Sequence, residues 1–104
     1  MSPATPDANT PGAAGVGPQA KPTLGRGYRL QWEPAQNAHV LLYPEGMVKL
    51  NASAGEILRR CDGVRTVQEI VADLEQAFAT TGLAADVAAF MSLALERHWL
   101  QMQA

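Results

Sequence analysis

The stretch that most constrains the fold of this chain is residues 39–51, which read His-Val-Leu-Leu-Tyr-Pro-Glu-Gly-Met-Val-Lys-Leu-Asn. Two arms rich in β-forming residues flank a Pro-Glu-Gly turn. Pro44 presets φ for the first central position of the turn, and Gly46 can take a positive φ at its exit, as in a type I turn with a bulge. The stretch therefore predicts a β-hairpin.

The outgoing arm of this hairpin has two different faces. Val48 and Leu50 lie on one face, and Met47 and Lys49 lie on the other. If no later segment pairs with this arm, it forms the edge of a sheet with open N–H and C=O groups. Such an edge is either an aggregation hazard that Lys49 counters, or a place where an extended peptide adds as a further strand.

Residues 1–25 cannot supply a core. They include five prolines, four glycines and five alanines, with only Met1, Val16 and Leu24 as larger apolar side chains. This composition predicts a disordered tail or a linker to another domain. It lacks the apolar run of a signal peptide, and no window of the chain approaches the roughly 18 apolar residues of a membrane span. We expect one soluble domain over residues 26–104 and no membrane partner.

The domain is predicted to begin with strands and to continue with helices. Tyr28, Leu30 and Trp32 alternate with polar residues, which predicts a half-buried strand whose apolar face covers the helices. With the hairpin, this strand makes a three-stranded antiparallel sheet. Three helices follow, so the expected fold is α+β, with the sheet packed on a three-helix bundle in a winged-helix-like arrangement.

The first two helices show capping and stripe patterns. Ser53 and Glu56 have capping-box spacing, as do Thr66 and Glu69. Gly63 is suited to the left-handed conformation that ends a helix. The apolar stripes behind the two caps are Ala54, Ile57, Leu58 and Cys61 in the first helix, and Val67, Ile70, Val71, Leu74 and Phe78 in the second.

The third predicted helix, residues 84–98, carries many alanines. Its apolar stripe consists of Val87, Phe90, Met91, Ala94, Leu95 and His98, and we expect it to fray near Trp99 and Leu100. Leu93 lies off this stripe. Small side chains beside a large apolar one indicate either a shallow groove that something covers or a helix packed closely on its neighbours.

No catalytic or metal-binding constellation is present in the sequence. His39 and His98 lack a carboxylate or cysteine at ligand spacing, and there is no phosphate loop or dinucleotide motif. Cys61, the single cysteine, continues an apolar stripe and is expected to be a buried small hydrophobe. A lone cysteine also fits a reducing compartment, so we expect a cytoplasmic protein. Because catalytic and cofactor-binding motifs are lacking, we expect that it is not an enzyme and holds no cofactor.

The order of strands and helices also fits a winged-helix regulator that binds nucleic acid, or a small protein-protein interaction module. Charge argues against nucleic acid. Residues 26–50 carry three basic and two acidic side chains, whereas residues 51–104 carry four basic and seven acidic ones. A recognition helix in this acidic half would be repelled by the phosphates of the nucleic acid.

Several of these elements together resemble one known family, the pyrroloquinoline quinone (PQQ) biosynthesis protein D family, PqqD. The resemblance covers about residues 26–100 and is specific as a set rather than residue by residue. The matching residues are Leu41 to Asn51, Ile57-Leu58, Cys61-Asp62-Gly63, Thr66-Val67-Gln68-Glu69-Ile70, Phe78 and Asp86-Val87.

The resemblance implies a noncatalytic peptide chaperone, a recognition element of pathways that modify ribosomally made peptides. Such a protein binds a precursor peptide and presents it to a radical S-adenosylmethionine (SAM) enzyme with iron–sulfur clusters, which cross-links a Glu and a Tyr of that peptide. The resemblance also implies possible fusion to, or association with, the oxidase that closes the rings of the cofactor.

In related modules the peptide adds as a strand to the third strand, in a groove completed by the third helix. Here those elements correspond to residues 47–51 and 84–98, the same two that the edge and the groove pointed to. The predicted peptide-binding residues are Met47, Val48, Lys49, Leu50, Asn51, Phe90, Leu93, Ala94 and Arg97.

Overall fold

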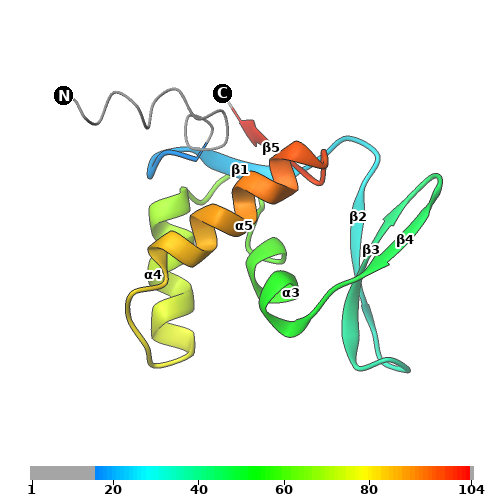
Figure 1. The fold of residues 1–104 in the computed structure, drawn as a ribbon, viewed down its shortest axis with the longest axis horizontal. Coiled ribbons are helices and arrows are strands. Elements are labelled where there is room, and N and C mark those ends of the chain that lie inside the picture. The colour runs from blue at the N-terminus through cyan, green and yellow to red at the C-terminus, as the bar shows by residue number, and fades with distance from the viewer. Residues whose placement is uncertain (1–15, 104) are drawn as a thin grey trace.

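The computed structural model describes residues 16–103, which form three helices and five strands (Figure 1). The strands are arranged in two sheets. In chain order the elements are β1 (Lys21–Leu24), β2 (Arg29–Glu33), β3 (Ala38–Tyr43), β4 (Gly46–Lys49), α3 (Ala52–Leu58), α4 (Val67–Ala77), α5 (Ala84–Glu96) and β5 (Leu100–Gln103). The α+β prediction with three helices is confirmed.

The predicted hairpin and three-stranded sheet are present, in the order β2-β3-β4 with antiparallel pairing. Tyr43 pairs with Gly46, so Pro44 and Glu45 form a two-residue turn. In Figure 1 this sheet stands at one side of the molecule, and α3 lies between it and α4. Gly55 allows close approach of α3 to β3, because a Cβ at this position would lie 2.7 Å from Nδ1 of His39.

The predicted apolar face of β2 covers the helices only in part. Tyr28 and Leu30 pack against the core, and the Tyr28 ring stacks on Tyr43 with ring centroids 5.3 Å apart. Trp32 is 49% exposed and makes an edge contact with the His39 ring instead. The prediction that Trp32 covers the helices is therefore wrong, because β2 extends beyond them.

A second sheet, β1 paired with β5, was not predicted. The pairing runs from Lys21 with Gln103 to Leu24 with Leu100. The prediction of disorder through residue 25 is therefore wrong for residues 21–24, while residues 1–15 lie outside the described part of the chain. Further backbone hydrogen bonds hold this segment, from Gly25 N–H to the Trp99 carbonyl (2.7 Å) and from Val67 N–H to the Ala20 carbonyl (2.8 Å).

The helix caps match the prediction in α4 but not in α3. At α4 the Glu69 N–H donates to Thr66 Oγ1 (3.1 Å) and the Thr66 N–H donates to Glu69 Oε1 (2.8 Å), so the predicted capping box is confirmed. At α3 the N-cap is Asn51, whose Oδ1 accepts from the Ala54 N–H at 2.8 Å. The predicted capping box of Ser53 with Glu56 is wrong, because the helix begins two residues earlier.

The end of α5 also differs from the prediction. The helix ends at Glu96, and His98, expected on its apolar stripe, is exposed with φ of 66°. Trp99 and Leu100 were expected at a fraying end, but they are buried where the chain turns into β5. Phe78, expected on the stripe of α4, follows that helix as its C-cap and is 54% exposed.

The core lies where β3, α3, α4 and α5 meet. Its largest fully buried side chains include Leu41, Leu58, Ile70 and Met91, one from each of these four elements. Leu50 and Trp99 extend this core toward the space between β4 and α5. The core thereby fixes the position of the exposed edge of β4 relative to α5.

Candidate functional site

The free edge of β4 is the first part of the candidate site. Within residues 16–103 the sheet order leaves β4 paired on one side only. The Leu50 N–H donates to the His39 carbonyl (3.0 Å), and Val48 pairs with Leu41 in the same register. Because hydrogen bonds alternate along an antiparallel strand, Val48 and Leu50 use their backbone groups toward β3, and Met47 and Lys49 direct theirs outward.

A groove separates this edge from α5. It has a volume of about 340 Å³ and is mostly apolar. Its lining combines the end of β4, the start of α3 and one side of α5. The residues are Val48, Lys49, Leu50, Asn51, Ser53, Ala54, Ile57, Asp86, Phe90, Leu93 and Trp99.

The groove brings together six of the residues predicted for peptide binding: Val48, Lys49, Leu50, Asn51, Phe90 and Leu93. Their role in binding a peptide stays a prediction. Leu93 is the most informative of them, since it is 38% exposed and lies off the apolar stripe of α5, as the sequence indicated. A large apolar side chain that remains partly exposed beside a groove is typical of a binding surface.

Three predicted residues lie elsewhere. Met47 is 54% exposed and points to the other face of β4, so only its backbone faces the open edge. Ala94 is fully buried in the core and cannot touch a ligand in the groove. Arg97 lies over the Trp99 ring, with Cζ 5.6 Å from the ring centroid, so it borders the site through Trp99.

Sequence reasoning missed Trp99 and Asp86 as lining residues. Trp99 packs against Phe90, with ring centroids 6.4 Å apart, and forms the wall at the end of α5. It was missed because no local pattern indicates that the chain turns back there into β5. Asp86 was visible as an acidic residue in the first turn of α5, but only the fold places that turn beside Asn51 and Ser53.

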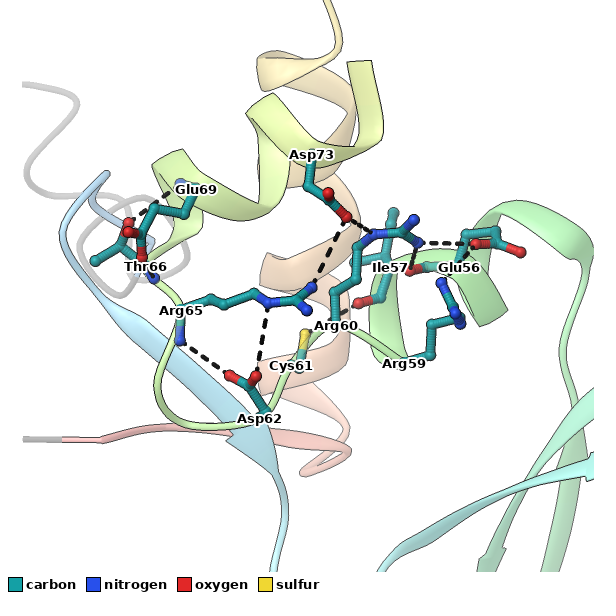
Figure 2. Close-up of polar contacts among 10 residues, drawn as sticks. All are labelled: Glu56, Ile57, Arg59, Arg60, Cys61, Asp62, Arg65, Thr66, Glu69 and Asp73. Atoms are coloured by element: carbon teal, nitrogen blue, oxygen red, sulfur yellow. Dashed lines mark hydrogen bonds and ion pairs between the residues drawn. The ribbon is translucent and has the colours of Figure 1, made fainter. Parts of the chain in front are cut away.

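A network of ion pairs joins α3 to α4, away from the groove (Figure 2). Arg60 is 7% exposed, and its Nη1 donates to Glu56 Oε1 (2.8 Å) and to the Glu56 carbonyl (2.9 Å), while its Nε donates to Asp73. Arg65 adds contacts to Asp62 and Asp73. The hydrogen bond from Arg60 lowers the pKa of both Glu56 and Asp73 below their ordinary values. The network stabilises the turn between the helices rather than forming a reactive centre.

Cys61 is a structural residue, as predicted. Its side chain is buried, and Sγ donates to the Ile57 carbonyl one turn earlier (3.2 Å). Burial, together with the smaller effect of the nearby Asp62 charge, raises the pKa of the thiol to about 12. The thiolate that a nucleophile requires is therefore not formed near neutral pH.

Two further observations apply to residues 16–103 alone. No group of three or more His, Cys, Asp and Glu side chains is arranged to hold a metal ion in this range. None of the helices in the same range is both long and apolar enough to cross a membrane.

Comparison with known protein families gives one match over most of the described chain. The family model of coenzyme PQQ synthesis protein D (PqqD) matches residues 38–100. This range includes β3, β4, all three helices and Trp99, and therefore every residue that lines the groove.

Individual relatives agree with this match. A PqqA binding protein of Stutzerimonas stutzeri is 53% identical over 83 residues, which cover 79% of this chain and 90% of the relative. A PqqA binding protein of Azotobacter vinelandii is 55% identical over 82 residues, covering 78% and 89%.

A solved structure is also similar. It is the solution NMR structure of the PqqD truncation of Methylobacterium extorquens PqqCD, described as a functional, stand-alone recognition element for ribosomally synthesised and post-translationally modified peptides. The TM-score is 0.58 at 32% identity, and the match covers 80% of this chain and 88% of that one.

Proposed function

The chain belongs to the coenzyme PQQ synthesis protein D (PqqD) family, and on this basis we propose that it is a noncatalytic peptide chaperone that binds the precursor peptide PqqA. Curated relatives that are more than half identical over the aligned 82 or 83 residues are named PqqA binding proteins. The observation that carries the proposal is the apolar groove beside an unpaired strand edge, which is the geometry that a bound peptide strand needs.

The peptide is proposed to add as a strand beside β4. The outward N–H and C=O groups of Met47 and Lys49 supply its main-chain hydrogen bonds, each with a net contribution of about 1 kcal/mol. Those bonds fix the register but carry little sequence information. Selectivity then comes from alternate peptide side chains that enter the groove against Phe90 and Leu93.

The charges at the groove favour one orientation of the peptide. Lys49 can pair with an acidic peptide residue at the strand edge, and Arg97, held over Trp99, offers a second positive charge near the end of α5. Asp86 contributes a negative charge at the opposite end of the groove, where α5 begins. A peptide with its own charges distributed in the complementary sense is bound in a single direction.

The proposed task of the complex is delivery of PqqA to a radical SAM enzyme with iron–sulfur clusters, which cross-links a Glu and a Tyr of the peptide. Family membership supports this partner. Association with the ring-closing oxidase of the pathway is proposed as well. It is supported by the similar solved structure, which is the PqqD part of a longer PqqCD chain. In this arrangement the Pro/Ala/Gly-rich residues before β1 would serve as a linker.

The test is an NMR titration of the isotope-labelled chain with synthetic PqqA, following every backbone amide. We expect shifts concentrated in residues 47–51 and along α5. Leu93→Asp places a charge in the apolar groove and is expected to weaken binding at least tenfold, since a desolvated charge without a partner is costly.

The matched control is Val64→Asp, which introduces the same charge at an exposed apolar residue that lines neither the groove nor a pocket beside it. This variant should bind PqqA as the unchanged protein does. Equal affinity of the Leu93→Asp variant and the unchanged protein would remove the groove from the proposal. Absence of shifts at high peptide excess would remove peptide binding altogether.

A further inference from the structure

A second apolar pocket lies next to the groove, on the other side of the start of α3. It has a volume of about 350 Å³, and the first turns of α3 and α5, the end of α4 and the loop between α4 and α5 form its walls. The lining residues that it does not share with the groove are Ala52, Glu56, Leu74, Phe78, Thr80, Leu83 and Val87. Phe78, which is 54% exposed, lies at its rim.

The pocket and the groove are adjacent. Ser53, Ile57 and Asp86 line both of them. Ser53 and Ile57 belong to α3, which follows β4 after Asn51, and Asp86 belongs to the first turn of α5. A peptide strand on the β4 edge that continues past Asn51 therefore passes Asp86 and reaches the pocket.

The pocket wall is fixed without a ligand. The Leu83 N–H, at the start of α5, donates to Glu75 Oε2 on α4 at 2.9 Å, so the loop between the two helices is tied to α4. Ala79 and Gly82 supply the positive φ angles that the loop needs to turn back, at 50° and 78°. A preformed apolar pocket binds a side chain without the entropy cost of ordering its own wall.

The charged residues of the pocket indicate which kind of peptide residue it can bind. The two carboxylates of the pocket are Glu56 and Asp86. Glu56 is already paired with Arg59 and Arg60, which follow the end of its helix. Asp86 takes part in none of the ion pairs found among residues 16–103. The shared boundary of pocket and groove is therefore apolar with one available negative charge.

We propose that this pocket is an anchor site for the same bound peptide: a large apolar side chain, lying outside the segment that pairs with β4, enters it, and a neighbouring Lys or Arg of the peptide pairs with Asp86. The inference rests on the proposed function, because a peptide bound in the groove is what comes within reach of the pocket. It adds a second contact point beyond the strand edge, and so sets which part of the precursor is held and which part is left free.

The first experiment fills the pocket from its rim. Ala52 is exposed at the first turn of α3 and lines the pocket but not the groove. Ala52→Trp is expected to raise the Kd for synthetic PqqA about tenfold, the loss that follows from excluding one large apolar side chain. Ala72→Trp is the control, because it adds the same bulk at an exposed alanine of α4 that lines neither the pocket nor the groove, and it should leave the Kd unchanged. Calorimetric titration measures all three proteins.

Two trimmed PqqA peptides, one shortened at each end, localise the anchor. The peptide that lacks the anchor should bind the unchanged protein about tenfold more weakly than the full peptide does. The same trimmed peptide should bind the Ala52→Trp variant and the unchanged protein with equal affinity. Asp86→Asn should weaken binding of the full peptide several-fold at low salt and much less at high salt, whereas Glu96→Gln at the far end of α5 should have no effect.

A measurement on the unchanged protein gives an answer that does not depend on how a variant folds. In the complex, peptide protons should show nuclear Overhauser effects to the methyl groups of Leu83 and Val87 as well as to Leu93. Contacts at Leu93 alone, with the affinity of the Ala52→Trp variant unaltered, would overturn the anchor and leave the groove function standing. Absence of peptide contacts at Leu93 as well as at Leu83 and Val87 would overturn the proposed function itself.

Discussion

Arg60 is the single residue on which the junction between α3 and α4 most depends. Its guanidinium is nearly buried, yet it donates to the side chain and the backbone of Glu56 and to Asp73 of the next helix (Figure 2). Charge-assisted hydrogen bonds of this kind are stronger than neutral ones. Arg60 thereby holds α3 and α4, two of the three helices that contribute to the walls of the apolar pocket, at a fixed distance.

We expect Arg60→Leu to lower the free energy of unfolding by about 1–3 kcal/mol, because hydrogen bonds to charged groups are lost while the apolar volume is kept. Arg59→Leu is the control. Arg59 pairs with the same Glu56 at 3.4 Å, but half of its side chain is exposed, and its loss should cost less than about 0.5 kcal/mol. Urea unfolding measures both variants, and equal losses would show that the network does not stabilise the junction.

The sequence predicted the burial of Cys61 but not that of its neighbour Arg60. Cys61 lies on an apolar stripe at helical spacing, which is sufficient to predict its burial. Arg60 follows Arg59 and precedes Cys61, and a basic residue in that position is ordinarily solvated. Its pairing with Glu56 at i,i+4 is a local pattern, but its contact with Asp73 depends on how α4 packs, which no local pattern specifies.

Among the elements, the start of α3 shows how a cap changes the boundary of a helix. Asn51 ends the connection from β4 and caps α3 through its side-chain oxygen. We expect Asn51→Ala to lower the free energy of unfolding by about 1 kcal/mol, since the Ala54 N–H loses its acceptor. Ser53→Ala should change it by less than about 0.5 kcal/mol. Thermal unfolding measures both variants, and a larger loss of stability in Ser53→Ala than in Asn51→Ala would show that Ser53 is the cap.

The edge of β4 allows a test that separates binding from folding. The Lys49 N–H points away from β3, so Lys49→Pro removes a donor of the open edge and leaves the pairing with β3 intact. We expect this variant to fold and to bind PqqA several-fold more weakly. Val48→Pro removes a hydrogen bond to β3 and should destabilise the hairpin strongly. Normal binding by a folded Lys49→Pro variant would argue against strand addition at this edge.

Elements with local signals were predicted well, and those that depend on distant partners were not. The hairpin, the capping box of α4 and the apolar stripes follow from neighbouring residues. β1 and β5 are four-residue strands separated by most of the domain, one in a Pro- and Gly-rich segment and the other directly after a helix. Each is stable only because the other pairs with it, and sequence periodicity over four residues cannot reveal such a pair.

For the molecule as a whole, the two-stranded sheet ties the first described segment to the last. A chain that begins at residue 26, the boundary that composition indicated, lacks β1 and the contacts of Ala20 and Pro22 with the start of α4 and Gly63. We expect its Tm to fall by several degrees or more, because a small domain has little stability to lose. A chain that begins at residue 16 retains β1 and should have the Tm of the full chain.

The groove was predictable in outline because its two walls each carried a signal, an unpaired hairpin arm and a stray Leu93 on an alanine-rich helix. That these walls face one another follows only from the packed fold. Ala94 illustrates the limit. It was assigned to the groove with Phe90 and Leu93 of the same helix, although it also lies on the apolar stripe, and the rotation of α5 directs it into the core.

The pairing of Lys21 with Gln103 has a consequence for how the domain can be connected to another protein. Both ends of the folded part leave from neighbouring strands, so a partner joined ahead of β1 or behind β5 is tethered at nearly the same point. Gene fusions in either order would then hold the partner at a similar distance from the groove. A short bridge between these ends should also permit a circular permutation with new termini in an exposed loop.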